Sequence, residues 1–164
     1  MTGPDAVMAL HVALGAVGLL LGPLALACEG PPRYRSTAGT AYAWVTAGVG
    51  LTAIALVAED PAQLWWLSIL ALGTAGLATL GRRAPVRHGR QWVRAYAHGQ
   101  GGSYIALVTA ALVVSLEGTA QLAAWIMPIA VGLPLIERRV RHIREAVDAS
   151  IRKPCPAASV PRAR

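Results

Sequence analysis

Charged residues are scarce in this 164-residue chain, and five long stretches contain none. These mostly apolar stretches are 6–28, 36–58, 61–81, 95–116 and 118–136. A helix needs about 20 apolar residues to cross the hydrocarbon core of a membrane, so each stretch is long enough. A soluble helical domain is disfavoured, because its helices would keep a polar face and these stretches are apolar around their whole circumference.

The last two stretches are separated only by Glu117. One continuous helix over 95–136 would be about 63 Å long, roughly twice the thickness of the hydrocarbon core. The chain is therefore expected to turn near Glu117 and Gly118. The sequence predicts an all-α fold, an integral membrane bundle of five helices that forms one domain over residues 1–151.

Lysine and arginine are missing from every second connection between these helices. The connection from Glu29 to Arg35 holds two, that from Arg82 to Arg94 holds five, and the tail after Glu137 holds eight, which accounts for all 15. Cytoplasmic loops are the ones enriched in lysine and arginine. The prediction is a multi-pass protein of the cell inner membrane, with its N-terminus outside and its C-terminus in the cytoplasm.

Cysteine is also rare, with only Cys28 and Cys155. In this topology both face or approach the reducing cytoplasm, so no disulfide is expected, and neither has the spacing of a metal ligand. The first stretch has some likeness to a cleaved signal that ends at Cys28. It is predicted to be a retained helix, because no lysine or arginine precedes Arg33 and the apolar run is longer than a signal core.

Catalytic signatures are lacking as well. The chain has no glycine-rich phosphate loop with its lysine, no paired carboxylates at one depth, and no zinc cluster of cysteine and histidine. Ser103 and His98 have no acidic partner within the bundle to complete a triad. The interpretation leans towards a protein that is not an enzyme.

Polar side chains inside the apolar stretches are the places to look for function, because burying them in hydrocarbon is costly unless they pair or line a cavity. The clearest cluster of them lies where the fourth helix begins. The candidates for binding a small or lipid-like ligand, or a partner helix, are His11, Tyr96, His98, Gln100, Ser103 and Tyr104. The alternative is that they are hydrogen-bonded within the bundle.

Intramembrane histidines suggest haem as an alternative, which would make the chain a membrane redox protein. His11 lies near the outer edge of the first helix and His98 near the inner edge of the fourth. Their expected separation of about 15 to 20 Å is too large for one iron. No cofactor is therefore predicted, and His11 and His98 stay the candidates for a metal.

Three residues of the fifth stretch, Pro128, Gly132 and Pro134, are candidates for breaking its helix. A broken helix near the membrane centre can free a carbonyl for a transported ion. A packing kink is the favoured interpretation, because no charged residue lies inside any stretch.

Most of the basic residues lie in three segments, 82–94, 137–151 and the tail 152–164. For the first segment nucleic-acid binding is disfavoured, because contact with anionic lipid headgroups explains the arginines with fewer assumptions. Residues 137–151 are expected to form a basic helix that either extends the fifth helix or lies on the membrane surface. The tail is predicted to be disordered.

Small residues recur along the first two helices, at Gly18 and Gly22 and at Gly39 and Ala43. Such faces let helices approach closely. They are expected to pack within the bundle, against a second copy, or against another membrane protein, in which case the chain would be a structural subunit of a complex.

The order of several short motifs resembles a family of predicted bacterial multi-pass membrane proteins catalogued as a domain of unknown function. These motifs are His11-x3-Gly15 leading to Gly22-Pro23, Gly39-x2-Tyr42, Gly-Gly-Ser103-Tyr104-Ile105 and Trp125-x2-Pro128-x3-Gly132-x-Pro134. Members of that family commonly have histidines where this chain has Tyr34-Arg35 and Tyr96. The resemblance implies the membrane architecture and no activity, and any site built on those histidines is incomplete here.

Overall fold

The computed structural model describes residues 3–28, 36–59, 61–83 and 92–152, which form five helices and contain no strand. The helices are α1 (Gly3–Cys28), α2 (Thr37–Glu59), α3 (Pro61–Arg83), α4 (Trp92–Ser115) and α5 (Thr119–Arg152). The predicted all-α fold with five helices is confirmed. Expectations for the arginines of 29–35 and 84–91, for Cys155 and for the tail beyond 152 concern residues outside the described ranges.

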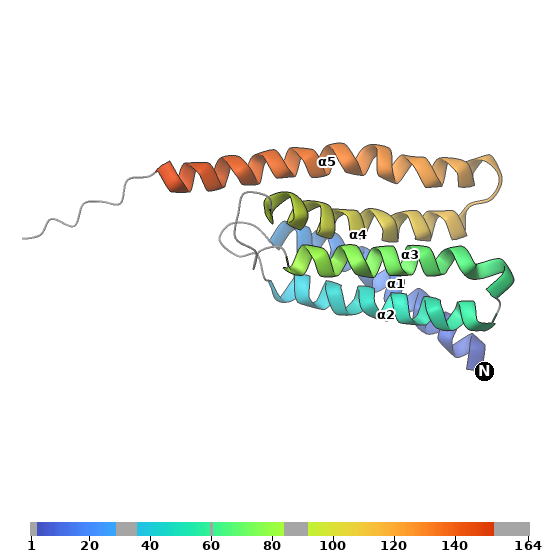
Figure 1. Cartoon of the computed structure of the whole chain (residues 1–164). Helices are drawn as coiled ribbons and strands as arrows, with labels where there is room; N and C mark the ends of the chain where they lie inside the picture. The colour runs from blue at the N-terminus through green and yellow to red at the C-terminus, as the bar shows by residue number, and fades with distance from the viewer. Residues whose placement is uncertain (1–2, 29–35, 60, 84–91, 153–164) are drawn as a thin grey trace, which may run out of the picture.

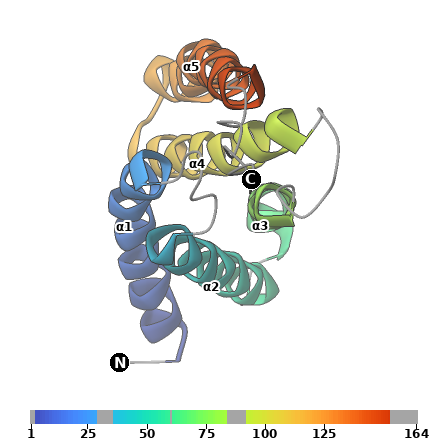
Figure 2. The ribbon, with the colours of Figure 1, turned by 90° about the vertical axis from the view of Figure 1, so that its left-hand side faces the viewer.

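Successive helices pack side by side, and α4 also packs on α1, so the first four helices close into a ring (Figures 1 and 2). α5 lies outside this ring and packs mainly on α4. Side chains of α5 also reach two other helices: Trp125 contacts the Trp66 ring of α3, and Arg139 bonds to the Leu26 carbonyl of α1. The core between α4 and α5 contains Tyr96, Val93 and Val140. A second cluster joins α1, α2 and α4 through Ala25, Tyr42 and Leu107.

Local features of the chain set the starts of α2 and α5. The Ser36 hydroxyl accepts a bond of 2.9 Å from the backbone N–H of Gly39, which satisfies one of the donors that α2 leaves unpaired at its start. Gly118 has a φ of 61°, a conformation that costs little only for glycine. The chain therefore reverses between α4 and α5 where the sequence predicted a turn.

The fifth helix is longer than a membrane crossing requires. Its 34 residues span about 51 Å, and they join the predicted fifth stretch and its basic extension in one helix. Figure 1 shows α5 continuing past the ends of the other helices. Pro128, Gly132 and Pro134, the candidates for breaking it, all lie within this continuous helix.

Many large apolar side chains are exposed on the outside of the bundle, and several of the buried positions are alanines. Leu20 is 78% exposed and Trp44 is 76% exposed, whereas the buried positions include Ala25, Ala53 and Ala78. This distribution is typical of helices that face lipid and approach one another through small residues. By length and composition, three helices are apolar enough to cross a membrane, at Pro4–Cys28, Thr37–Glu59 and Thr119–Ala149.

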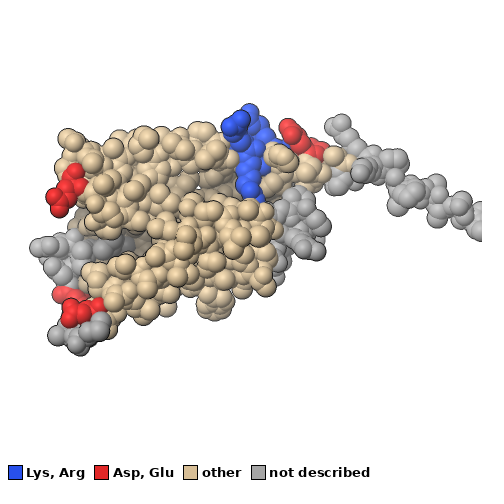
Figure 3. All heavy atoms as spheres, turned by 180° about the vertical axis from the view of Figure 1, so that it is seen from behind, with Lys and Arg blue, Asp and Glu red and all other residues tan. Residues whose placement is uncertain are grey.

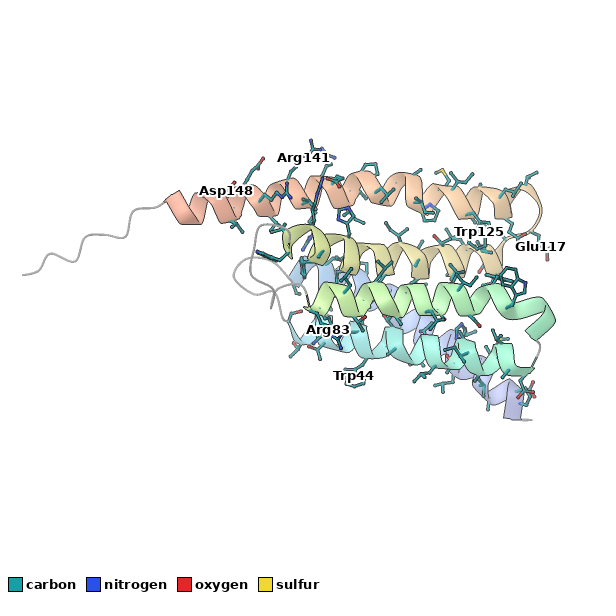
Figure 4. All side chains as sticks on the ribbon, in the orientation of Figure 1. Trp44, Arg83, Glu117, Trp125, Arg141 and Asp148 are labelled. Atoms are coloured by element: carbon teal, nitrogen blue, oxygen red, sulfur yellow. The ribbon has the colours of Figure 1, made fainter. Side chains whose placement is uncertain are left out.

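Charges gather at the two ends of the bundle (Figure 3). The acidic end comprises the start of α1 with Asp5, the end of α2 with Glu59, and the turn after α4 with Glu117. Arginines lie at the other end, the basic end, which Figure 4 marks with Arg83 and Arg141. The acidic residues Glu145 and Asp148 lie further along α5, beyond this band of arginines.

Candidate functional site

The polar residues at the start of α4 lie mainly at helix interfaces. Tyr96 is buried against α5, and Gln100 and Ser103 are also buried. The Ser103 hydroxyl donates to the Gln100 carbonyl at 2.9 Å, so its oxygen accepts the hydroxyl hydrogen of Tyr42 at 3.1 Å. These side chains tie α4 to α2 and α5. The Gln100 amide nitrogen is buried without a partner among the described residues, and a ligand or water would satisfy it.

Ser103, Tyr104 and Ile105 are consecutive, yet they reach three different helices. Ser103 bonds to Tyr42 of α2, and the Tyr104 hydroxyl donates to the Leu19 carbonyl of α1 at 3.4 Å. The Tyr104 ring covers Gly22 of α1, and the Ile105 side chain covers Gly132 of α5. The short motifs noted in the sequence are thus partners: each residue of this tripeptide contacts a residue from another motif.

His98 lies at the basic end. Its Nδ1 contacts the Arg94 carbonyl at 3.0 Å, and its Nε2 lies 3.2 Å from the Glu137 carboxylate of α5. The side chains of His98 and Glu137 are 38% and 45% exposed, so water screens this pair and it contributes little to stability. The sequence offered no signal for this contact, because the two residues are 39 positions apart on different helices.

His11 lies in α1 and bonds to α2. Its Nδ1 is 2.8 Å from the Thr52 hydroxyl oxygen. That hydroxyl has one hydrogen, which it donates to the backbone carbonyls of Gly48 and Val49 at 2.9 and 3.0 Å. With the Thr52 hydrogen directed to these carbonyls, the His11 Nδ1 is assigned as the donor to Thr52. In the neutral ring, Nε2 is then the nitrogen with a free lone pair.

A cavity of about 310 Å³ lies between α1, α2, α3 and α4, in the half of the bundle nearer the acidic end. Among the described residues, each of these helices contributes one polar side chain to the wall, namely His11, Thr46, Thr74 and Ser115. The rest of the wall consists of valine, leucine, alanine and glycine. Among the residues predicted as ligand-binding candidates, His11 alone lines this cavity.

Sequence reasoning identified His11 but missed the other polar groups of the cavity wall. Thr46, Thr74 and Ser115 stand alone in apolar surroundings of three different helices, and nothing in their spacing links them. The available signal was the pair His11 and Gly15, which lie one turn apart on α1 and both line the cavity. Because Gly15 has no side chain, it leaves space on the helix face that also carries His11.

The two candidate metal ligands lie too far apart to share one ion. Ser115 lines the cavity together with His11, and it lies 17 residues beyond His98 on α4, which is about 25 Å of helix. Over the described ranges, no group of three or more histidine, cysteine, aspartate or glutamate side chains is arranged to hold a metal ion. A haem ligated by both His11 and His98 is therefore incompatible with the fold.

Comparison with known proteins gives no relative: no protein-family model, curated protein or solved structure matches this chain. The resemblance to the bacterial membrane family stays a prediction. The functional interpretation rests on the cavity.

Proposed function

We propose that this chain is a five-span inner-membrane protein that binds a small, lipid-soluble molecule in the cavity enclosed by α1, α2, α3 and α4. The observation that carries the proposal is the cavity of about 310 Å³ itself. Ligand pockets are typically apolar spaces of about 300 to 1,000 Å³ with a few placed polar groups. An apolar cavity of only about 150 Å³ already holds benzene, so this one has room for a substituted ring.

The topology that goes with this proposal has the acidic end outside and the basic end in the cytoplasm. Support comes from the arginines, which lie at one end of the described bundle, and from the general enrichment of such residues in cytoplasmic loops. We expect alkaline phosphatase to be active when fused after Pro61 or Gly118 and inactive when fused after Ala84 or at the C-terminus. An active C-terminal fusion contradicts the proposed topology.

Gly15 provides the test of ligand binding. A Cβ atom added there meets no atom within 4 Å, and the residue lines the cavity. Gly15→Leu is therefore expected to fill the space without a clash and to abolish saturable binding of para-trifluoromethylphenol. Binding is measured by fluorine NMR in lipid nanodiscs, with protein-free nanodiscs as the blank for partition into lipid.

Gly73→Leu is the matched control. Gly73 is also free of atoms within 4 Å of an added Cβ, but it is exposed on α3 and does not line the cavity. This variant is expected to bind the phenol like the unsubstituted protein. The proposal is overturned if the unsubstituted protein shows no saturable binding, or if Gly15→Leu binds as well as Gly73→Leu.

A further inference from the structure

The described hydroxyl groups in the cavity wall donate their hydrogens to backbone carbonyls of their own helices. Thr46 donates to the Tyr42 carbonyl at 2.8 Å, and Thr74 donates to the Leu70 carbonyl at 2.7 Å. Ser115 donates in the same way to the carbonyl four residues before it, at 2.7 Å. Each hydroxyl has a single hydrogen, so towards the cavity these oxygens offer only lone pairs.

The imidazole of His11 follows the same pattern. Its Nδ1–H donates to Thr52, whose own hydrogen goes to backbone carbonyls, so Nε2 carries a lone pair. None of the described residues that line the cavity is a carboxylate, so none of them compensates a positive charge on the ring. The four polar side chains that line the cavity among the described residues are therefore all hydrogen-bond acceptors.

From this arrangement we infer that the cavity selects an uncharged, mainly apolar ligand that carries a hydroxyl or N–H donor. The inference rests on the proposed ligand-binding function and adds the chemistry of the ligand. A phenol, a hydroquinone or a long-chain alcohol satisfies the acceptors. A quinone, an ether or a carboxylate offers only further acceptors, so its oxygens would be buried without partners at considerable cost.

His11 is the strongest of these acceptors, and Thr52 is the residue that positions it. The Thr52 side chain does not line the cavity, but its oxygen holds the ring hydrogen on Nδ1. Without that oxygen the hydrogen is free to move to Nε2, where the ring becomes a donor. Thr52→Val should therefore change the chemistry of the cavity and leave its volume unchanged.

The test compares para-trifluoromethylphenol with its methyl ether, para-trifluoromethylanisole, by fluorine NMR in nanodiscs. The ether lacks the donor and is otherwise similar in shape. We expect it to bind about tenfold more weakly than the phenol, which corresponds to the loss of one buried hydrogen bond. In Thr52→Val this preference is expected to disappear, and in Thr52→Ser, which keeps the oxygen, it is expected to persist.

Nitrogen NMR of isotope-labelled histidine gives a readout that does not depend on binding. The His11 signal, assigned by its loss in His11→Leu, is expected to show a hydrogen on Nδ1 in the unsubstituted protein and in Thr52→Ser. A hydrogen on Nε2 instead overturns the inference, and so does equal affinity for the phenol and the ether.

The outcomes separate this inference from the proposed function. If both probes bind equally and Gly15→Leu abolishes both, the cavity is a binding site and the selection for donors is wrong. If neither probe binds saturably, the proposed function fails and the inference fails with it.

Discussion

Gly99→Val is expected to separate α3 from α4 and to destabilise the bundle by about 3 kcal/mol or more, as overpacking against an immobile wall does. A Cβ atom at Gly99 would lie 2.6 Å from the Gly81 Cα, 2.7 Å from the Leu77 carbonyl oxygen, and also against the Gly81 nitrogen. All three are backbone atoms of α3. No side-chain rotation can relieve the overlap, so the helices themselves must move apart.

The measurement is the unfolding midpoint of the detergent-solubilised protein, followed by circular dichroism. Gly76→Val is the control, because an added Cβ there meets no atom within 4 Å and the site is exposed on α3. It adds the same side chain to a helix of the same bundle and should change the stability by less than about 0.5 kcal/mol. Equal midpoints for the two variants would show that α3 and α4 do not approach as closely as described.

Arg139→Met is expected to cost about 1.5 to 3 kcal/mol, the range for a hydrogen bond that involves a charged group. The Arg139 guanidinium of α5 donates from Nη2 to the carbonyl of Leu26, near the end of α1. That carbonyl is among the last four of its helix, which have no partner within the helix. α1 has no basic residue in its own last turn, so the cation that complements its dipole comes from α5.

The control for this second prediction is Arg141→Met, on the same helix. Arg141 is exposed and its replacement removes the same charge from the same end of the bundle. We expect the unfolding midpoint to fall for Arg139→Met only, and limited proteolysis to cut α5 more readily in that variant. If both substitutions lower the unfolding midpoint equally, the cause is the loss of positive charge and the contact with Leu26 does not stabilise the bundle.

The helices were predictable because charged residues mark the two ends of each apolar stretch in the sequence. Glu117 and Gly118 marked the turn, and Gly118 occupies the left-handed conformation that allows it. The continuation of α5 past Glu137 was one of two expectations for the basic extension. Its apolar residues Val140 and Ile143 are buried against α4, so packing extends the helix beyond the apolar stretch.

The site was predictable only in part, because its parts come from four helices. His11 stood out as a polar residue in an apolar stretch, whereas Thr46 and Thr74 looked like ordinary threonines bonded to their own helices, as indeed they are. The sequence could not reveal that these threonine hydroxyls line the same cavity. Likewise Tyr96 and Ser103 looked available for a ligand, and only the packing of α4 against its neighbours shows them buried.

The tripeptide Ser103, Tyr104 and Ile105 has a consequence for how the chain assembles. Successive residues of a helix point about 100° apart, so these three contacts hold α4 from three directions within a single turn. Rotating α4 about its axis would break all three contacts at once. Inserting one residue just before Ser103 would also break them, because it turns every later residue of the helix by about 100°. The partners of Ser103 and Tyr104 belong to α1 and α2, which are made earlier, whereas the partner of Ile105 belongs to α5, which is made later. The angular position of α4 is therefore held jointly by two helices that are made before it and one that is made after it.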